Sequence, residues 1–191
     1  MNPQESNEAK TLWKMFYAAE SFQRARQSAE HILNNKLEKD DPLFRPLLVA
    51  TYVLYAKPFT NATSVGRLTE DIIPKQHLDF HKVMMQHRNQ VYAHRDADGF
   101  EVADYGTVNQ VRALQTGNRL YMFATEFHTR YPAMPKIIEL CKILEEKAKY
   151  HSDKLWKKYH TQVPKKKGEF VLNVTDQQAD IWIPGKPMDP F

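Results

Sequence analysis

The chain has 191 residues, of which 42% are hydrophobic and 26% are charged, so it is large and apolar enough to fold around a buried core. This composition excludes a chain that is disordered along its whole length. The formal net charge of +4 permits binding to nucleic acid or to an acidic protein but demands neither.

The single cysteine and the lengths of the apolar runs indicate the cellular compartment. Cys141 is the one cysteine, which excludes an intrachain disulfide and any cysteine-based zinc site. A reducing compartment is the simplest interpretation. The N-terminal residues are polar, and the longest apolar run, 46–56, is shorter than the roughly 20 residues that cross a bilayer. We therefore expect a cytoplasmic protein without a membrane partner.

Apolar residues at intervals of three and four predict two helices near the start of the chain. The first covers residues 8–36 and buries one stripe. The residues of this stripe are Leu12, Met15, Phe16, Ala19, Phe22, Ala25, Ala29, Ile32 and Leu33. Asp41 and Pro42 are typical of an N-cap and a first turn, and they start a second helix that runs to about Lys57. Because LLVATYVLYA is apolar on nearly every side, we expect this helix at the centre of the fold.

Two further helices follow. The third begins at Pro74 and should reach His94 or Arg95 before DADG, residues 96–99, stops it. Its stripe consists of Phe80, Met84, His87, Val91 and His94. The last long helix covers about 135–160, with a stripe of Ile137, Cys141, Leu144, Ala148, His151 and Leu155.

The segment between these helices changes character. VNQVRAL and RLYMFATEF are rich in β-branched and aromatic residues, and QTGN lies between them, which predicts a β-hairpin within about 100–127. From Val163 we expect an extended tail with a short strand at 170–174. The predicted fold is mainly α. It is an antiparallel four- to five-helix bundle over 1–162, with the hairpin as an insertion and the tail at 163–191.

The stretch HRNQVYAHRD, residues 87–96, gathers arginine, asparagine and histidine at the end of the third helix. An ideal helix turns about 100° per residue, so His94 lies about 240° round from Arg88, and the two meet only if the helix end unwinds. His87 and His94 share one row, and Arg88 and Arg95 share the next. A second copy related by a two-fold axis would double this set of side chains in one groove.

Phosphodiester cleavage is the chemistry that suits such a groove. A histidine with a pKa near neutrality can take a proton from a ribose 2′-hydroxyl or give one to the leaving oxygen. A guanidinium binds the phosphate with a fork of donors and stabilises developing negative charge, and an asparagine can orient either group. We expect no metal and no other cofactor, and we name His87 and Arg95 as candidate substrate contacts.

Arg88, the polar Asn89, four further residues and then His94 resemble the Arg-X4–6-His motif of the HEPN superfamily. The resemblance implies a bundle of four or five helices and a metal-independent endoribonuclease. It implies a homodimer whose paired motifs form one active site for RNA. It assigns Arg88 and His94 as the catalytic pair and Asn89 as their support.

The resemblance also implies a setting of phage defence or a toxin–antitoxin pair, with an antitoxin or regulatory protein as a partner. In HEPN members paired with a nucleotidyltransferase, a tyrosine occupies the second position after the motif histidine. Asp96 stands there in this chain, which argues against that paired type.

Other interpretations of the same residues remain open. A HEPN-like bundle without catalysis would bind RNA or protein. His77 and His81 have the spacing of a metal-binding helix face, but no pair of Glu-x-x-His motifs accompanies them, so surface positions are the simpler interpretation. His87 alone is typical of a packed histidine, and Arg95 of a cation at a helix end. Lys165–Lys167 suits an RNA backbone or a solvated surface.

Overall fold

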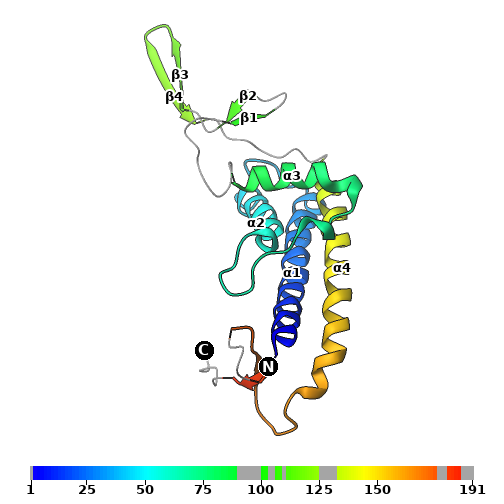
Figure 1. The fold of residues 1–191 in the computed structure, drawn as a ribbon. Coiled ribbons are helices and arrows are strands. Elements are labelled where there is room, and N and C mark those ends of the chain that lie inside the picture. The colour runs from blue at the N-terminus through cyan, green and yellow to red at the C-terminus, as the bar shows by residue number, and fades with distance from the viewer. Residues whose placement is uncertain are drawn as a thin grey trace. The chain divides into compact units, whose positions relative to one another are not determined.

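The computed structural model describes residues 2–89, 100–102, 106–108, 111–124, 133–175 and 180–185. This part of the chain is mainly helical, with small antiparallel hairpins (Figure 1). Its helices are α1 (Pro3–Asn34), α2 (Phe44–Ala56), α3 (Leu78–His87) and α4 (Met134–Tyr159). Its short 3₁₀ turns are η1 (Lys57–Phe59), η2 (Glu70–Ile72), η3 (Lys75–His77) and η6 (His160–Gln162). No helix in these ranges combines the length and the apolar character needed to cross a membrane.

The chain divides into two compact units. The terminal unit comprises Met1–Gln23, Lys57–Ile72 and Lys142–Phe191, and the middle unit comprises Arg24–Ala56 and Ile73–Cys141. Helices α1 and α4 each contribute residues to both units.

Helix α1 confirms the first predicted helix but begins earlier. Asn2 and Glu5 form a capping box, because the Glu5 N–H donates to Asn2 Oδ1 at 2.8 Å and the Asn2 N–H donates to Glu5 Oε2 at 2.9 Å. Pro3 occupies the first helical position, where its missing N–H costs nothing. One position of the predicted stripe is wrong, since Phe16 is 62% exposed. Ala18, which is buried, lies about 200° round the helix from Phe16, nearly on the opposite face.

Helix α2 begins at Phe44, slightly later than the start predicted at Asp41 and Pro42. The Leu43 N–H donates to Asp41 Oδ1 at 2.8 Å, so Asp41 stabilises the turn that leads into the helix. The buried residues of α2 are Phe44, Leu48, Thr51, Tyr52, Tyr55 and Ala56. Val49 and Val53 are partly exposed, although they belong to the same apolar run. An apolar sequence allows burial on every side, but here only one face is covered completely.

Helix α3 follows the turn η3 after Pro74. Residues 88 and 89 continue it as a π-helical turn. Met84 and His87 are buried, as predicted, but Phe80 is partly exposed and His81 takes its place on the buried side. The predicted continuation to His94 or Arg95 lies outside the described residues.

The predicted hairpin is confirmed as strands β3 (Val111–Thr116) and β4 (Arg119–Ala124), which pair antiparallel with Thr116 opposite Arg119. Gly117 has a φ of +57° and Asn118 does not have a positive φ, as in the type II′ turn that suits a two-residue hairpin loop. A second hairpin, β1 (Phe100–Val102) with β2 (Gly106–Val108), was not predicted as a separate element.

Helix α4 confirms the last predicted helix. Its buried stripe differs from the predicted one in the C-terminal half of the helix. Cys141, Leu144 and Ala148 are buried as expected, but His151 is exposed, and the buried side continues through Ser152. The stripe advances by four residues at this point instead of three, and both intervals fit a period of 3.6.

The C-terminal tail contains the predicted strand, β5 (Phe170–Leu172), and a partner strand, β6 (Trp182–Pro184). Within the terminal unit, Ile181 packs with Ala9 of α1 and Tyr159 of α4. Trp182 Nε1 donates to the carbonyl of Tyr159 at 3.0 Å. The described part of the tail is therefore attached to the helices by apolar contacts and a hydrogen bond.

Candidate active site

Two tyrosines of α2 hydrogen-bond two histidines of α3 in the middle unit. The hydroxyl of Tyr55 lies 2.8 Å from Nδ1 of His81, and the hydroxyl of Tyr52 lies 3.3 Å from Nδ1 of His87. All four residues are buried. Buried polar side chains are stable only when they are paired, so these contacts fix the rotation of α3 on α2 directly before Arg88.

His87 is neutral at physiological pH. Burial lowers its pKa to about 4, because the interior disfavours the charged imidazolium. The ring is 7% exposed and lies against Tyr52, with the ring centroids 5.5 Å apart. In this position it supports the helix end, and its role as a substrate contact stays a prediction.

His81 is not a surface residue, so that interpretation of the sequence is wrong. It is 2% exposed, whereas His77 is partly exposed. His81, Met84 and His87 follow one another at intervals of three, which places them along one side of α3. This spacing was visible in the sequence. The hydroxyl of Tyr55, which makes the buried position favourable, comes from another helix.

Arg88 and Asn89 lie together at the end of α3. The Arg88 backbone N–H donates to the carbonyls of Met84 and Met85, and Arg88 Nη1 donates to Asn89 Oδ1 at 2.9 Å. Asn89 therefore orients the guanidinium through Nη1. Arg88 Nε is buried. A buried N–H normally has an acceptor, but no described residue accepts a hydrogen bond from Nε of Arg88.

The structure brings together three of the five predicted site residues. His87, Arg88 and Asn89 are consecutive at the end of α3. His94 and Arg95 lie outside the described residues, and their roles stay predictions. The residues that the sequence analysis did not assign to the site are Tyr52 and Tyr55, which anchor α3.

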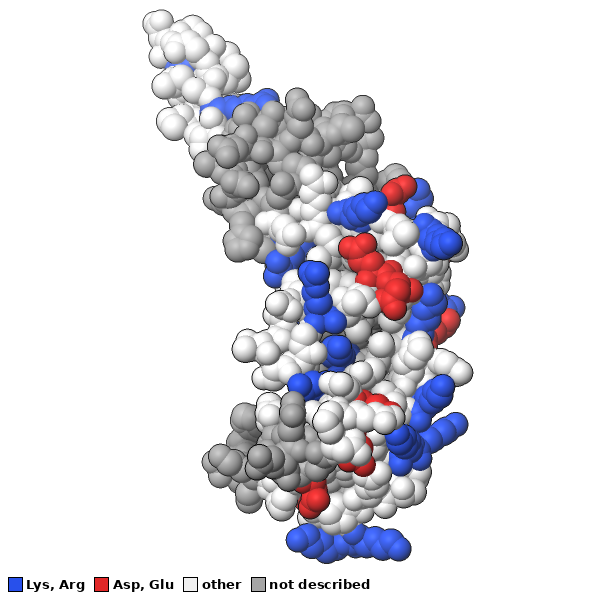
Figure 2. Space-filling view, in the orientation of Figure 1, with Lys and Arg blue, Asp and Glu red and all other residues white. Residues whose placement is uncertain are grey.

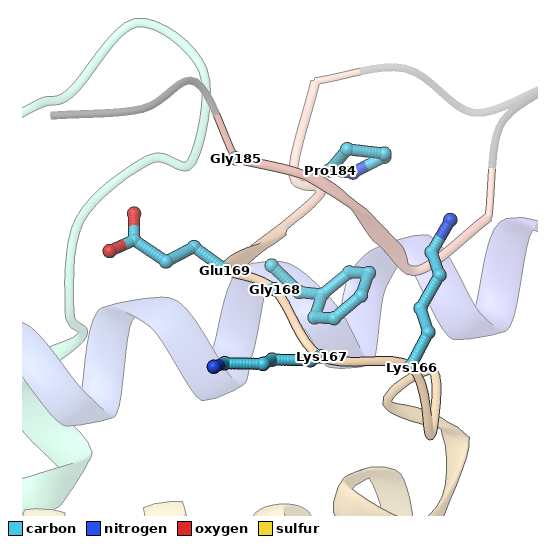
Figure 3. Close-up of a pocket in the computed structure, with 7 residues that line it drawn as sticks. Lys166, Lys167, Gly168, Glu169, Pro184 and Gly185 are labelled. Carbon is cyan, nitrogen blue, oxygen red and sulfur yellow. The ribbon is translucent and has the colours of Figure 1, made fainter.

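Two lysines of the triplet border a separate hollow in the terminal unit. This hollow has a volume of about 450 Å³ and is lined by Lys166, Lys167, Gly168, Glu169, Phe170, Pro184 and Gly185. Figure 3 shows that the side chains of Lys166 and Lys167 point in different directions. Two ammonium groups that do not converge cannot hold one phosphate between them, so we assign no anion site here.

Comparison with known proteins identifies no relative of this chain. No protein-family model, no curated protein and no solved structure matches it. The resemblance of Arg88, Asn89 and His94 to the HEPN motif therefore stays a prediction from the sequence.

Proposed function

We propose that this protein is a metal-independent endoribonuclease of the HEPN type, built as a helical bundle and active as a homodimer. One observation carries the proposal. Arg88 stands at the end of α3 with its guanidinium oriented by Asn89, directly after a turn that the His87–Tyr52 hydrogen bond anchors to α2. A positioned guanidinium is what transition-state stabilisation at a phosphate requires.

In the proposed reaction His94 takes the proton from a ribose 2′-hydroxyl. The 2′-oxygen attacks the adjacent phosphorus, the bond to the 5′-oxygen breaks, and a proton returns to that leaving oxygen. The products are a 2′,3′-cyclic phosphate and a 5′-hydroxyl. Arg88 neutralises the charge that builds on the phosphate oxygens, and Asn89 holds the guanidinium in one orientation.

The state of His87 limits the choice of the proton carrier. With its pKa near 4, this histidine stays neutral between pH 6 and 8 and cannot act as an acid there. Among the residues of HRNQVYAHRD, His94 is then the one histidine left to give a proton to the leaving oxygen. The proposal therefore predicts that activity follows the titration of His94 and not of His87.

Cleavage of a mixed RNA in the presence of EDTA tests the proposal. We expect cleavage by a wild-type dimer. The rate should fall about 10²- to 10⁴-fold in His94→Ala and about 10²- to 10³-fold in Arg88→Ala. His151→Ala changes an exposed histidine of α4 and is the matched control. Circular dichroism and light scattering check the folding and size of each variant. EDTA-resistant cleavage that His94→Ala leaves unchanged would overturn the assignment.

A second candidate function is a module that binds RNA or protein without catalysis. The hairpin β3–β4 favours it, because Val111, Leu120 and Met122 share one face of the hairpin and are each more than 60% exposed. Arg112 and Arg119 lie on the other face, and residues 111–124 contain no acidic side chain. Figure 2 shows the hairpin as white and blue without red. Binding that survives in Arg88→Ala and is lost in Met122→Ser would favour this function.

A further inference from the structure

Helix α1 carries an exposed aromatic cluster in the terminal unit. The rings of Trp13 and Tyr17 lie with their centroids 4.3 Å apart, and Phe16 meets Tyr17 edge-on at 6.0 Å. Phe16 is 62% exposed and Tyr17 is 45% exposed. Single exposed apolar residues are common, but adjoining aromatic rings at a surface are typical of binding sites.

Trp13 and Tyr17 form one wall of a groove with a volume of about 390 Å³. The other wall is the chain from Lys57 to Leu68, which follows α2. Pockets that take small molecules typically have volumes of about 300–1,000 Å³. The groove is therefore large enough for one planar group with a substituent.

The loop wall of the groove is held by backbone hydrogen bonds. The Gly66 N–H donates to the carbonyl of Ala62 at 2.8 Å, and the Leu68 N–H donates to the carbonyl of Pro58 at 2.8 Å. Gly66 has a φ of +73°, which a residue with a side chain rarely adopts. A groove whose wall is fixed in this way loses little conformational entropy when a ligand enters.

The charge of the groove selects an anion. The charged side chains among the described residues that line it are Lys14 and Lys57, and no carboxylate is among them. Asn61 adds an amide that can both donate and accept hydrogen bonds. Aromatic rings, two ammonium groups and an amide together suit a ligand with a flat ring, a phosphate and polar ring edges.

We propose that this groove binds a nucleotide. The base stacks on the rings of Trp13 and Tyr17, and the phosphate lies against Lys14 and Lys57. The same chemistry is presented by a free mononucleotide and by one nucleotide of an RNA strand. All the residues involved belong to the terminal unit, so the site does not depend on Arg88 or on ribonuclease activity.

Calorimetric titration of the full chain with AMP and, separately, with a five-residue oligoadenylate tests the proposal. We expect saturable binding of at least one of them, and weaker binding of ribose 5-phosphate and of inorganic phosphate because neither can stack. Oligoadenylate binding much tighter than AMP binding identifies an RNA strand as the source, and equal affinities identify the free nucleotide. AMP should bind His94→Ala protein and wild-type protein equally well, which separates this site from the proposed catalysis.

Variants of the groove make the test specific. Trp13→Ala should weaken binding about tenfold or more, in line with the loss of one base–aromatic stack, and Lys14→Ala with Lys57→Ala should also weaken it. Lys154→Ala, an exposed lysine of α4, is the control and should leave the affinity unchanged. Absence of saturable binding of both AMP and oligoadenylate to wild-type protein would overturn the proposal. So would unchanged affinity in a folded Trp13→Ala protein.

Discussion

Helix α3 buries polar side chains, whereas the hairpin β3–β4 exposes apolar ones. Helix α3 buries two histidines, His81 and His87, whereas the hairpin exposes Val111, Leu120 and Met122. The buried polar groups are stable because each histidine has a tyrosine partner on α2. The exposed apolar groups have no comparable compensation in a two-stranded hairpin, which is marginal on its own. The contrast teaches that contacts within the chain account for the buried polar groups of α3, whereas they leave the apolar face of the hairpin exposed.

The largest expected effect compares a methionine from each region. Met84 of α3 is 1% exposed and Met122 of β4 is 72% exposed. Met84→Ala removes buried apolar atoms and leaves a cavity, so we expect the free energy of unfolding to fall by about 2–5 kcal/mol. Met122→Ala should change it by less than about 0.5 kcal/mol. Urea denaturation measures both values, and equal losses in the two variants would contradict the contrast between these regions.

Local rules predicted most of the elements. Spacing of apolar residues indicates α1, α2 and α4, Asp41 marks the turn that leads into α2, and Gly117 marks the hairpin turn. Each of these features depends on residues close together in the chain. The strand β6 could not be predicted in the same way, because it forms by pairing with β5 across an intervening segment.

The candidate site was predictable only in part, for a related reason. The sequence places Arg88 and Asn89 next to each other, but the hydrogen bond between them depends on how the side chains turn. Periodicity cannot decide whether Phe80 or His81 is buried, since adjacent residues flank the same stripe. The hydroxyl of Tyr55, 26 positions earlier in the chain, decides in favour of His81. The position of His94 depends on the path of the chain after α3, which residue spacing does not determine.

The second prediction concerns how the free energy of unfolding depends on pH through His87 of α3. His87 has a pKa of about 4 in the folded chain and an ordinary value of 6.5 when unfolded, so the unfolded chain binds more protons between these values. Stability is then complete above about pH 6.5 and is lost as the pH falls toward 4. We expect a loss of about 2 kcal/mol between pH 7 and pH 5, measured by urea denaturation at each pH.

A control separates this effect from that of carboxylates. The hydrogen bond from Lys158 lowers the pKa of Glu8 below its ordinary value of 4.5, so the contribution of Glu8 to stability changes below that pH. The window from pH 5 to pH 6.5 therefore lies above the titration range of this carboxylate. His87→Phe should flatten the dependence in this window, and an unchanged slope in that variant would assign the effect to another group.

The smallest expected effect removes one hydroxyl from each region. Tyr55→Phe leaves Nδ1 of buried His81 without its tyrosine partner, and we expect a loss of about 1–2 kcal/mol in the free energy of unfolding. Tyr121→Phe removes a hydroxyl from a side chain of β4 that is 48% exposed, where water replaces any lost contact, so the change should stay within about 0.5 kcal/mol. Because the two substitutions are chemically identical, their difference measures what the buried Tyr55–His81 hydrogen bond contributes to stability, compared with an exposed hydroxyl. If Tyr55→Phe is as stable as wild type, the Tyr55–His81 bond does not stabilise α3 on α2, and the anchoring of the helix end would depend on apolar packing around Met84 instead.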